Sequence, residues 1–223
     1  MGFIEDALFD DDVKDLKISI KEMVSLVESA LQDAFEALKN RDKEGARRVL
    51  DGDDEIDLKE VQIEEKALEL IALRHPVKEN LRFIFTVVKI ITDLERIGDQ
   101  ACNIAHVVLM IADEPLLKPL IDLPRMLEIS TGMLRDGIKA LFEGDEELAR
   151  DVFNRDKELD ELYDQIFNEL LLFMIQDPHT IKRATGLLFV ARHFERVGDH
   201  ATNIAERAYY MITGRRIKEK FNL

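Results

Sequence analysis

The sequence is poor in the residues that break helices or form disulfides. It contains no tryptophan, one cysteine, ten glycines and five prolines in 223 residues. Scarce glycine and proline, with abundant Leu, Ala, Glu, Lys and Arg, favour helix over sheet. The single cysteine, Cys102, excludes a disulfide within the chain and is typical of a reducing compartment. The composition therefore predicts an all-α protein.

The chain also lacks a long apolar run and an excess of basic residues. Its most apolar stretch, residues 81–91, is interrupted by Arg82 and Lys89 and is too short to span a bilayer. Its first residues are acidic, where a secretory signal would be basic and then apolar, so we expect a cytoplasmic protein. A formal charge of −15 argues against nucleic-acid partners and suits divalent cations or basic protein partners.

What the chain does contain is an internal repeat. The eleven residues ERIGDQACNIA from Glu95 return 100 residues later as ERVGDHATNIA from Glu195, with eight identical positions. Their Glu, Asp and Asn recur every four residues, so on a helix they share one face. Matches at an offset of 103 extend the repeat to residues 37–57 and 140–160. Two copies of one unit are therefore predicted.

Helical periodicity runs through nearly the whole chain. In the first helix one apolar stripe comprises Leu16, Ile20, Met23, Val24, Val27, Leu31, Ala34, Phe35 and Leu38. Three prolines within residues 115–124 cannot continue a helix, so this segment is the expected linker. The predicted helices cover residues 11–40, 54–74, 77–112, 122–143, 146–175 and 178–213.

This order of helices predicts two tandem three-helix bundles. The first covers residues 1–113, the second covers residues 121–214, and residues 215–223 form a basic tail. Asp53 or Asp54 is expected to cap the second helix, and Gly214 to end the last. Gly98 and Gly198 fall in mid-helix, where glycine costs about 1 kcal/mol against alanine. Close packing of a neighbouring helix is their expected use.

The spacing places the repeated carboxylates level with one another. Around a turn at Pro76, Asp57 and Glu95 each lie 19 residues away, and Asp53 and Asp99 each lie 23 away. Equal arms of an antiparallel hairpin bring such residues together, since each residue rises about 1.5 Å. The second copy is arranged alike around its own turn. The two predicted clusters are Asp53, Asp57, Glu95 and Asp99 in the first copy and Asp156, Asp160, Glu195 and Asp199 in the second.

Four carboxylates at helix-packing distance require protonation, arginine pairing or metal. Arg192 lies one turn before Glu195 and could pair with it. Arg96 and Arg196 follow the glutamates directly, about 100° around the helix, and are not expected to share their face. Two interpretations therefore stay open: metal binding, and an acidic groove that arginine partly neutralises.

A metal site of this kind would be almost entirely of oxygen ligands. Such ligands favour hard divalent or ferric ions (Mg²⁺, Mn²⁺, Ca²⁺ or iron) and several ions per cluster. Asn103 and Asn203 are secondary candidates, as ligands or as hydrogen-bond partners of the carboxylates. A di-iron enzyme or metal-storage protein is the alternative function, but that class uses Glu-x-x-His, and no histidine here has Glu three residues before it.

These motifs resemble the PhoU family. The resemblance rests on LERIGD from Leu94, FERVGDHATNIAE from Phe194, the closing YMITG from Tyr210, and Ile-Asp and Leu-Asp pairs ending at Asp57 and Asp160. It implies two three-helix bundles that bind multinuclear metal clusters through the eight carboxylates. It also implies a non-enzymatic cytoplasmic regulator that acts negatively on phosphate uptake and on phosphate-starvation genes. The implied partners are the ATPase subunit of the phosphate ABC transporter, through which it reaches the membrane, and a sensor histidine kinase. A homodimer is left open.

Overall fold

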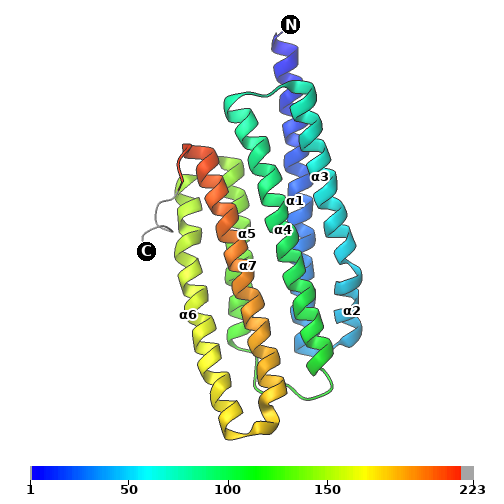
Figure 1. Cartoon of the computed structure of the whole chain (residues 1–223), viewed down its shortest axis with the longest axis vertical. Coiled ribbons are helices and arrows are strands. Elements are labelled where there is room, and N and C mark those ends of the chain that lie inside the picture. The colour runs from blue at the N-terminus through cyan, green and yellow to red at the C-terminus, as the bar shows by residue number, and fades with distance from the viewer. Residues whose placement is uncertain (1, 217–223) are drawn as a thin grey trace.

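The structure, a computed structural model, describes the backbone of residues 2–216 and the side chains of residues 11–216 (Figure 1). The helices are α1 (Gly2–Asn40), α2 (Lys43–Asp51), α3 (Asp53–Arg74), α4 (Lys78–Ile111), α5 (Asp122–Glu143), α6 (Glu146–Gln176), the short 3₁₀ helix η1 (Pro178–Thr180) and α7 (Ile181–Thr213). No strand occurs in this part of the chain, which confirms the all-α class. None of the described helices is both long and apolar enough to cross a membrane.

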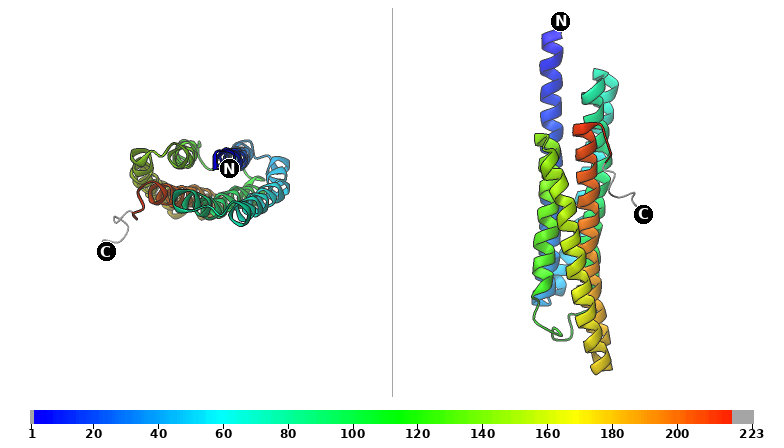
Figure 2. Two further views of the ribbon diagram at one scale, coloured as in Figure 1. Left: turned by 90° about the horizontal axis from the view of Figure 1, so that it is seen from above. Right: turned by 90° about the vertical axis from the view of Figure 1, so that its left-hand side faces the viewer.

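The two halves of the chain pack through one helix from each. α4 and α7 lie side by side and run in opposite directions, while α1 packs on α4 and α5 packs on α7 (Figure 1). α3 and α6 cover the two flanks, so α1 and α5 form one layer and α4 and α7 the other (Figure 2). The predicted tandem of helical bundles is confirmed. The predicted basic tail lies outside the described residues except for Arg215 and Arg216.

Helical periodicity correctly identified the side chains that form the core. Every residue of the apolar stripe predicted on α1 is buried, from Leu16 to Leu38. α4 and α7 are buried on most of their circumference because other helices surround them, and Leu94 and Phe194 have no exposed surface. Removal of this apolar area from water is the main force that holds the helices together.

The helical segment that follows α1 in the first copy of the repeat differs from the prediction. Residues 43–51, which were not assigned to a helix, form α2, and Gly52 separates it from α3. The cap of α3 is Gly52 without a side-chain hydrogen bond, so the prediction that Asp53 or Asp54 caps this helix was wrong. The side chain of Asp42 caps α2 instead, accepting from the Glu44 N–H at 3.0 Å. The second copy has one continuous helix here, α6, because arginine replaces the glycine.

Gly198 and Gly98 allow close helix packing, as predicted. A Cβ atom on Gly198 would lie 2.4 Å from Cδ2 of Leu159 on α6, and one on Gly98 would lie 3.0 Å from Cδ1 of Ile56 on α3. Gly214 ends α7 with a φ of 69°, a left-handed conformation that glycine adopts without strain, so this predicted helix end is confirmed.

Replacing Gly198 with alanine is predicted to destabilise the protein by roughly 1–3 kcal/mol, because the added methyl overlaps the buried Leu159 side chain. Gly132 in α5 is the matched control, since a Cβ there would meet only Arg155 Nη1 at 3.4 Å. Gly132→Ala is expected to stabilise by about 0.5–1 kcal/mol through helix propensity. Urea unfolding of both variants measures the two free energies, and equal changes would contradict the close packing at Gly198.

Candidate metal centres

The first predicted cluster lies where α3 faces α4. Burial, followed by the neighbouring carboxylates of Asp53 and Asp99, raises the pKa of Asp57 above its ordinary value. Burial and then the charge of Asp99 raise the pKa of Glu95, and Asp57 contributes further to this shift. The four side chains therefore act on one another electrostatically, as the spacing around Pro76 predicted.

The second cluster repeats this arrangement between α6 and α7. Burial and the charge of Asp199 raise the pKa of Asp160, and the same two causes raise the pKa of Glu195. Asp156 also faces α7, because its Oδ1 atom lies 3.5 Å from the Cβ position of Gly198. In the second cluster, as in the first, neighbouring carboxylates disfavour each other's ionised form.

The register of the helix pairs α3–α4 and α6–α7 agrees closely with the register predicted by counting residues from each turn. Ile56 contacts Gly98 in the first copy and Leu159 contacts Gly198 in the second, within two residues of the predicted levels. These apolar residues lie directly before Asp57 and Asp160, and the glycines lie directly before Asp99 and Asp199. The close apolar contact therefore sets how near the carboxylates on the facing helices come to each other.

Arginine neutralises these clusters only in part. Arg96 pairs with Glu95 at 3.3 Å and with Asp99 at 3.1 Å, so the expectation that it does not share their face was wrong. The long side chain lies along its own helix and reaches both the preceding residue, Glu95, and Asp99, three residues later. In the second copy Arg192 pairs with Glu195 at 2.6 Å, as expected, and Arg196 lies 3.6 Å from Asp199.

One carboxylate oxygen of Glu195 has no hydrogen-bond donor to offset its burial. Oε2 is buried and has no hydrogen-bond partner, while Oε1 accepts from Arg192. A buried acceptor without a donor is costly, and a cation would satisfy it. Among the described residues, however, no three His, Cys, Asp or Glu side chains are grouped so that they could hold a metal ion. The donor chemistry fits a hard cation, whereas the side chains do not form a ready coordination cage.

The secondary candidates differ between the copies. Asn103 is exposed, and Asn203 donates from Nδ2 to Asp93 Oδ1 on α4 at 3.2 Å, a carboxylate outside the eight. Cys102 lies beside the first cluster, where burial and the Asp53 carboxylate raise its pKa to about 12. Its thiol therefore stays protonated at neutral pH and is unsuited to bind metal as a thiolate.

Two polar pairs across the α4–α7 contact were missed by the sequence reasoning. His200 Nδ1 lies 2.9 Å from Asp93 Oδ1, and His193 Nδ1 lies 2.9 Å from Gln100 Oε1. The repeat relates Asp93 to His193 and Gln100 to His200, so each pair joins one repeat position to the other. The sequence signal that could have identified these pairs is the difference between the two copies at these positions, which lie beside motif residues that are identical in both copies.

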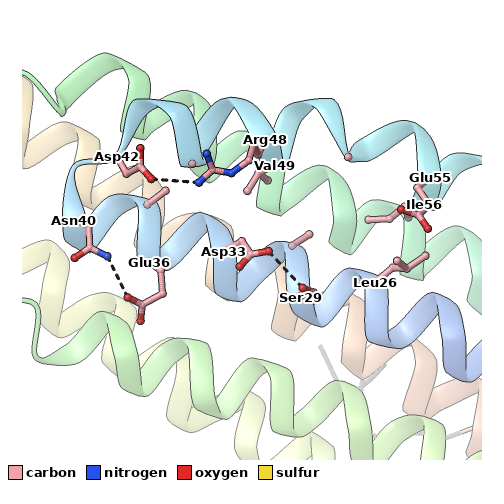
Figure 3. A pocket seen from close by; sticks show the side chains of 14 residues that line it. Leu26, Ser29, Asp33, Glu36, Asn40, Asp42, Arg48, Val49, Glu55 and Ile56 are labelled. Atoms are coloured by element: carbon pink, nitrogen blue, oxygen red, sulfur yellow. Dashed lines mark hydrogen bonds and ion pairs between the residues drawn. The ribbon is translucent and has the colours of Figure 1, made fainter.

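A separate groove of about 380 Å³ lies between α1 and α2–α3 (Figure 3). None of the eight carboxylates lines it. Its polar side chains bond to one another, with Ser29 donating to Asp33 at 3.4 Å and Arg48 donating to Asp42 at 3.4 Å. We therefore place the candidate centres at the carboxylate clusters and not in this groove.

The repeated motif and the paired bundles correspond to a known family. The family model described as PhoU domain matches residues 20–108 and again residues 123–208. The chain belongs to the PhoU family. It is 42% identical to a phosphate-specific transport system accessory protein PhoU homolog of Aquifex aeolicus, covering 94% of this chain and 95% of that protein. A Clostridium acetobutylicum protein of the same name is 37% identical, with coverage of 94% and 96%.

Solved structures of the PhoU family share the fold. PhoU from Pseudomonas aeruginosa superposes with a TM-score of 0.87 at 31% identity, covering 93% of this chain and 100% of that chain. The phosphate transport system regulatory protein PhoU from Streptococcus pneumoniae gives a TM-score of 0.86 at 29% identity, covering 94% and 99%. The resemblance seen in the sequence is thus confirmed over nearly the whole chain.

Neutralising Glu195 is predicted to stabilise the metal-free protein at neutral pH. A raised folded-state pKa means that its stabilising contribution is complete below the ordinary value and is lost as pH rises through the raised value. Glu195→Gln should therefore melt close to the parent protein at pH 4 and several degrees above it at pH 7.5, measured in EDTA.

Glu22→Gln is the control of opposite sign. Its hydrogen bond and ion pair with Lys59 lower the pKa of Glu22, so its contribution is present above the ordinary value and is lost as pH falls. This variant should match the parent at low pH and melt lower at pH 7.5. The same pH trend in both variants would contradict the proposed repulsion at Glu195.

Proposed function

We propose that the chain is a cytoplasmic, non-enzymatic regulator of phosphate transport that binds metal and connects the transporter to its sensor. In this role it restrains phosphate uptake and phosphate-starvation genes, acting on the ATPase subunit of a phosphate ABC transporter and on a sensor histidine kinase. The observation that carries the proposal is the doubled motif within a chain that matches the PhoU domain model twice. The names of its relatives, which describe accessory proteins of phosphate transport, support the same process.

The metal part of the proposal rests on the charge of the clusters. The pKa values of Asp57, Glu95, Asp160 and Glu195 are all raised, although arginine side chains lie beside both glutamates. Divalent or ferric cations would supply the missing positive charge, and their ligands would be the eight carboxylates, with Asn103 and Asn203 as secondary ligands. Binding requires these side chains to turn toward a shared ion, which exposed or half-buried carboxylates can do.

Replacing Asp57 and Asp99 together with alanine should remove metal from the first cluster and leave the second intact. The metal content per chain is then expected to fall by about half, because two of four ligands are lost on one side only. Elemental analysis of protein purified without chelator, and calorimetric titration with Mn²⁺, measure the change.

The matched control is the double change of Glu65 and Glu69 to alanine. These two carboxylates are also four residues apart, but they lie on the exposed face of α3 outside the clusters. Their removal should leave the metal content unchanged. Equal metal content in the parent and both variants would show that the first cluster holds no metal and would favour the acidic groove there.

Deleting the gene is expected to leave phosphate-starvation genes active in phosphate-rich medium, because the restraint on the sensor is lost. Transcript measurement tests this, and the tagged protein should co-purify with the transporter ATPase or the kinase. A metal-dependent enzyme predicts the opposite pattern: unchanged transcripts, and substrate or oxygen turnover that carboxylate variants lose while remaining folded. That pattern would overturn the regulatory role.

A further inference from the structure

α1 and α5 lie side by side in the layer opposite α4 and α7 (Figure 2). The ion pair between Glu28 and Arg135, 2.5 Å long, bridges the two helices. Arg135 borders two cavities that residues of both helices line, one of about 590 Å³ and the other of about 540 Å³. We name the first the lysine cavity, because Lys17, Lys21 and Lys139 line it, and the second the twin cavity.

The internal repeat relates the two cavities, but their chemistry has diverged. At an offset of 103, the positions of Lys17, Lys21, Lys139 and Phe142 in the lysine cavity correspond to Leu120, Pro124, Glu36 and Lys39 in the twin cavity. The lysine cavity therefore carries four cations and one carboxylate, Glu143, whereas the charged side chains of the twin cavity balance. A property present in one copy alone is not required by the fold that both copies share.

The lysines of this cavity have no carboxylate partner among the described residues. Lys17, Lys21 and Lys139 form no ion pair with any described residue, although the chain has a formal charge of −15. The ammonium group of Lys17 lies 5.4 Å from the Phe83 ring and 5.5 Å from the Phe142 ring. Aromatic contacts hold Lys17 and Lys21 at the cavity, and the charge of all three lysines is left for an external partner.

The shape and spacing of the groups indicate an extended occupant. Lys17 and Lys21 are one turn apart on α1, and Arg135 and Lys139 are one turn apart on α5, so cations line both walls. Apolar side chains of Val24, Ile138 and Phe142 complete the lining. Lysines can bind a phosphate as point charges, but these walls add no backbone N–H donors to such a site, because the N–H groups of inner helical turns are already bonded.

We propose that the lysine cavity docks an amphipathic helix of a partner protein, with carboxylates on both flanks of its apolar stripe. The apolar stripe would lie on the apolar lining, and the flanking carboxylates would pair with the lysines on each wall. The proposal deepens the adaptor role and rests on it, since it gives the chemistry by which one partner would be recognised.

A photo-crosslinking amino acid placed at Ser25, in full-length protein in cells, tests the proposal. Ser25 is exposed in the lysine cavity, and its repeat counterpart Glu128 is exposed in the twin cavity. The probe at Ser25 is expected to crosslink a segment that mass spectrometry identifies as a net acidic, amphipathic helix of another protein. The probe at Glu128 should capture at least tenfold less of it. Equal capture at both sites, no capture, or capture of this chain itself would overturn the proposal.

Reversing the charge of the three lysines distinguishes specific recognition of the partner helix from general electrostatic attraction. The triple change Lys17→Glu, Lys21→Glu and Lys139→Glu should reduce the crosslink at least tenfold, while changing all three to Arg should retain it. Reversal of Lys78, Lys157 and Arg207, exposed elsewhere, gives the same net charge and should leave the crosslink intact. Equal loss in both reversed proteins, or binding of inorganic tripolyphosphate that competes away the crosslink with no acidic helix identified, would overturn the proposal. Circular dichroism and melting confirm that each variant is folded.

Transcript measurement in a strain that carries the reversed triple variant and in the deletion strain distinguishes failure of the docking site from failure of the adaptor role. If the reversed triple variant regulates phosphate-starvation genes as the parent does, the docking proposal is wrong and the adaptor role stands. If gene deletion leaves those genes unchanged while the acidic helix is captured at Ser25, the adaptor role is wrong and the site stands.

Discussion

The contact between α4 and α7 is the constraint on which the rest of the structure depends. Each of these helices carries one copy of the repeated motif, and each packs on both the other half and its own flanking helix. Small residues make this contact close: a Cβ on Gly186 of α7 would lie only 2.7 Å from Ile111 of α4. Because α4 forms one wall of the first cluster and α7 one wall of the second, this contact sets the position of the two clusters relative to each other.

The carboxylate clusters oppose the stability of the fold that presents them. Like charges one helical turn apart repel, and the facing helix adds more of the same sign. Burial of apolar neighbours such as Leu94 and Ile97 holds the helices in place despite this repulsion. A local arrangement that works against folding, repeated in both halves, is better explained by a function than by the fold itself.

Sequence reasoning succeeded where local rules decide the structure. The helical period and the proline positions predicted the arms, and counting residues from Pro76 predicted their register within two residues. It failed where a single residue or a long side chain decides the local structure. Gly52 divides one arm into α2 and α3, and the long side chain of Arg96 reaches Asp99 three residues later, features that the apolar periodicity does not encode. Contacts between the halves, such as His200 with Asp93, depend on how two helices cross in space.

The differences between the two copies separate structural from functional requirements. The glycines and the eight carboxylates occur in both halves, as expected for features that each bundle needs for itself. The pairs across the α4–α7 contact, by contrast, differ: the repeat maps the pair Asp93–His200 onto the pair His193–Gln100, so one pair contains a carboxylate and the other an amide. In both pairs a histidine of the second copy faces an oxygen acceptor of the first copy. The internal symmetry is therefore broken at the contact that joins the halves, and broken again where α1 and α5 leave a charged face to solvent.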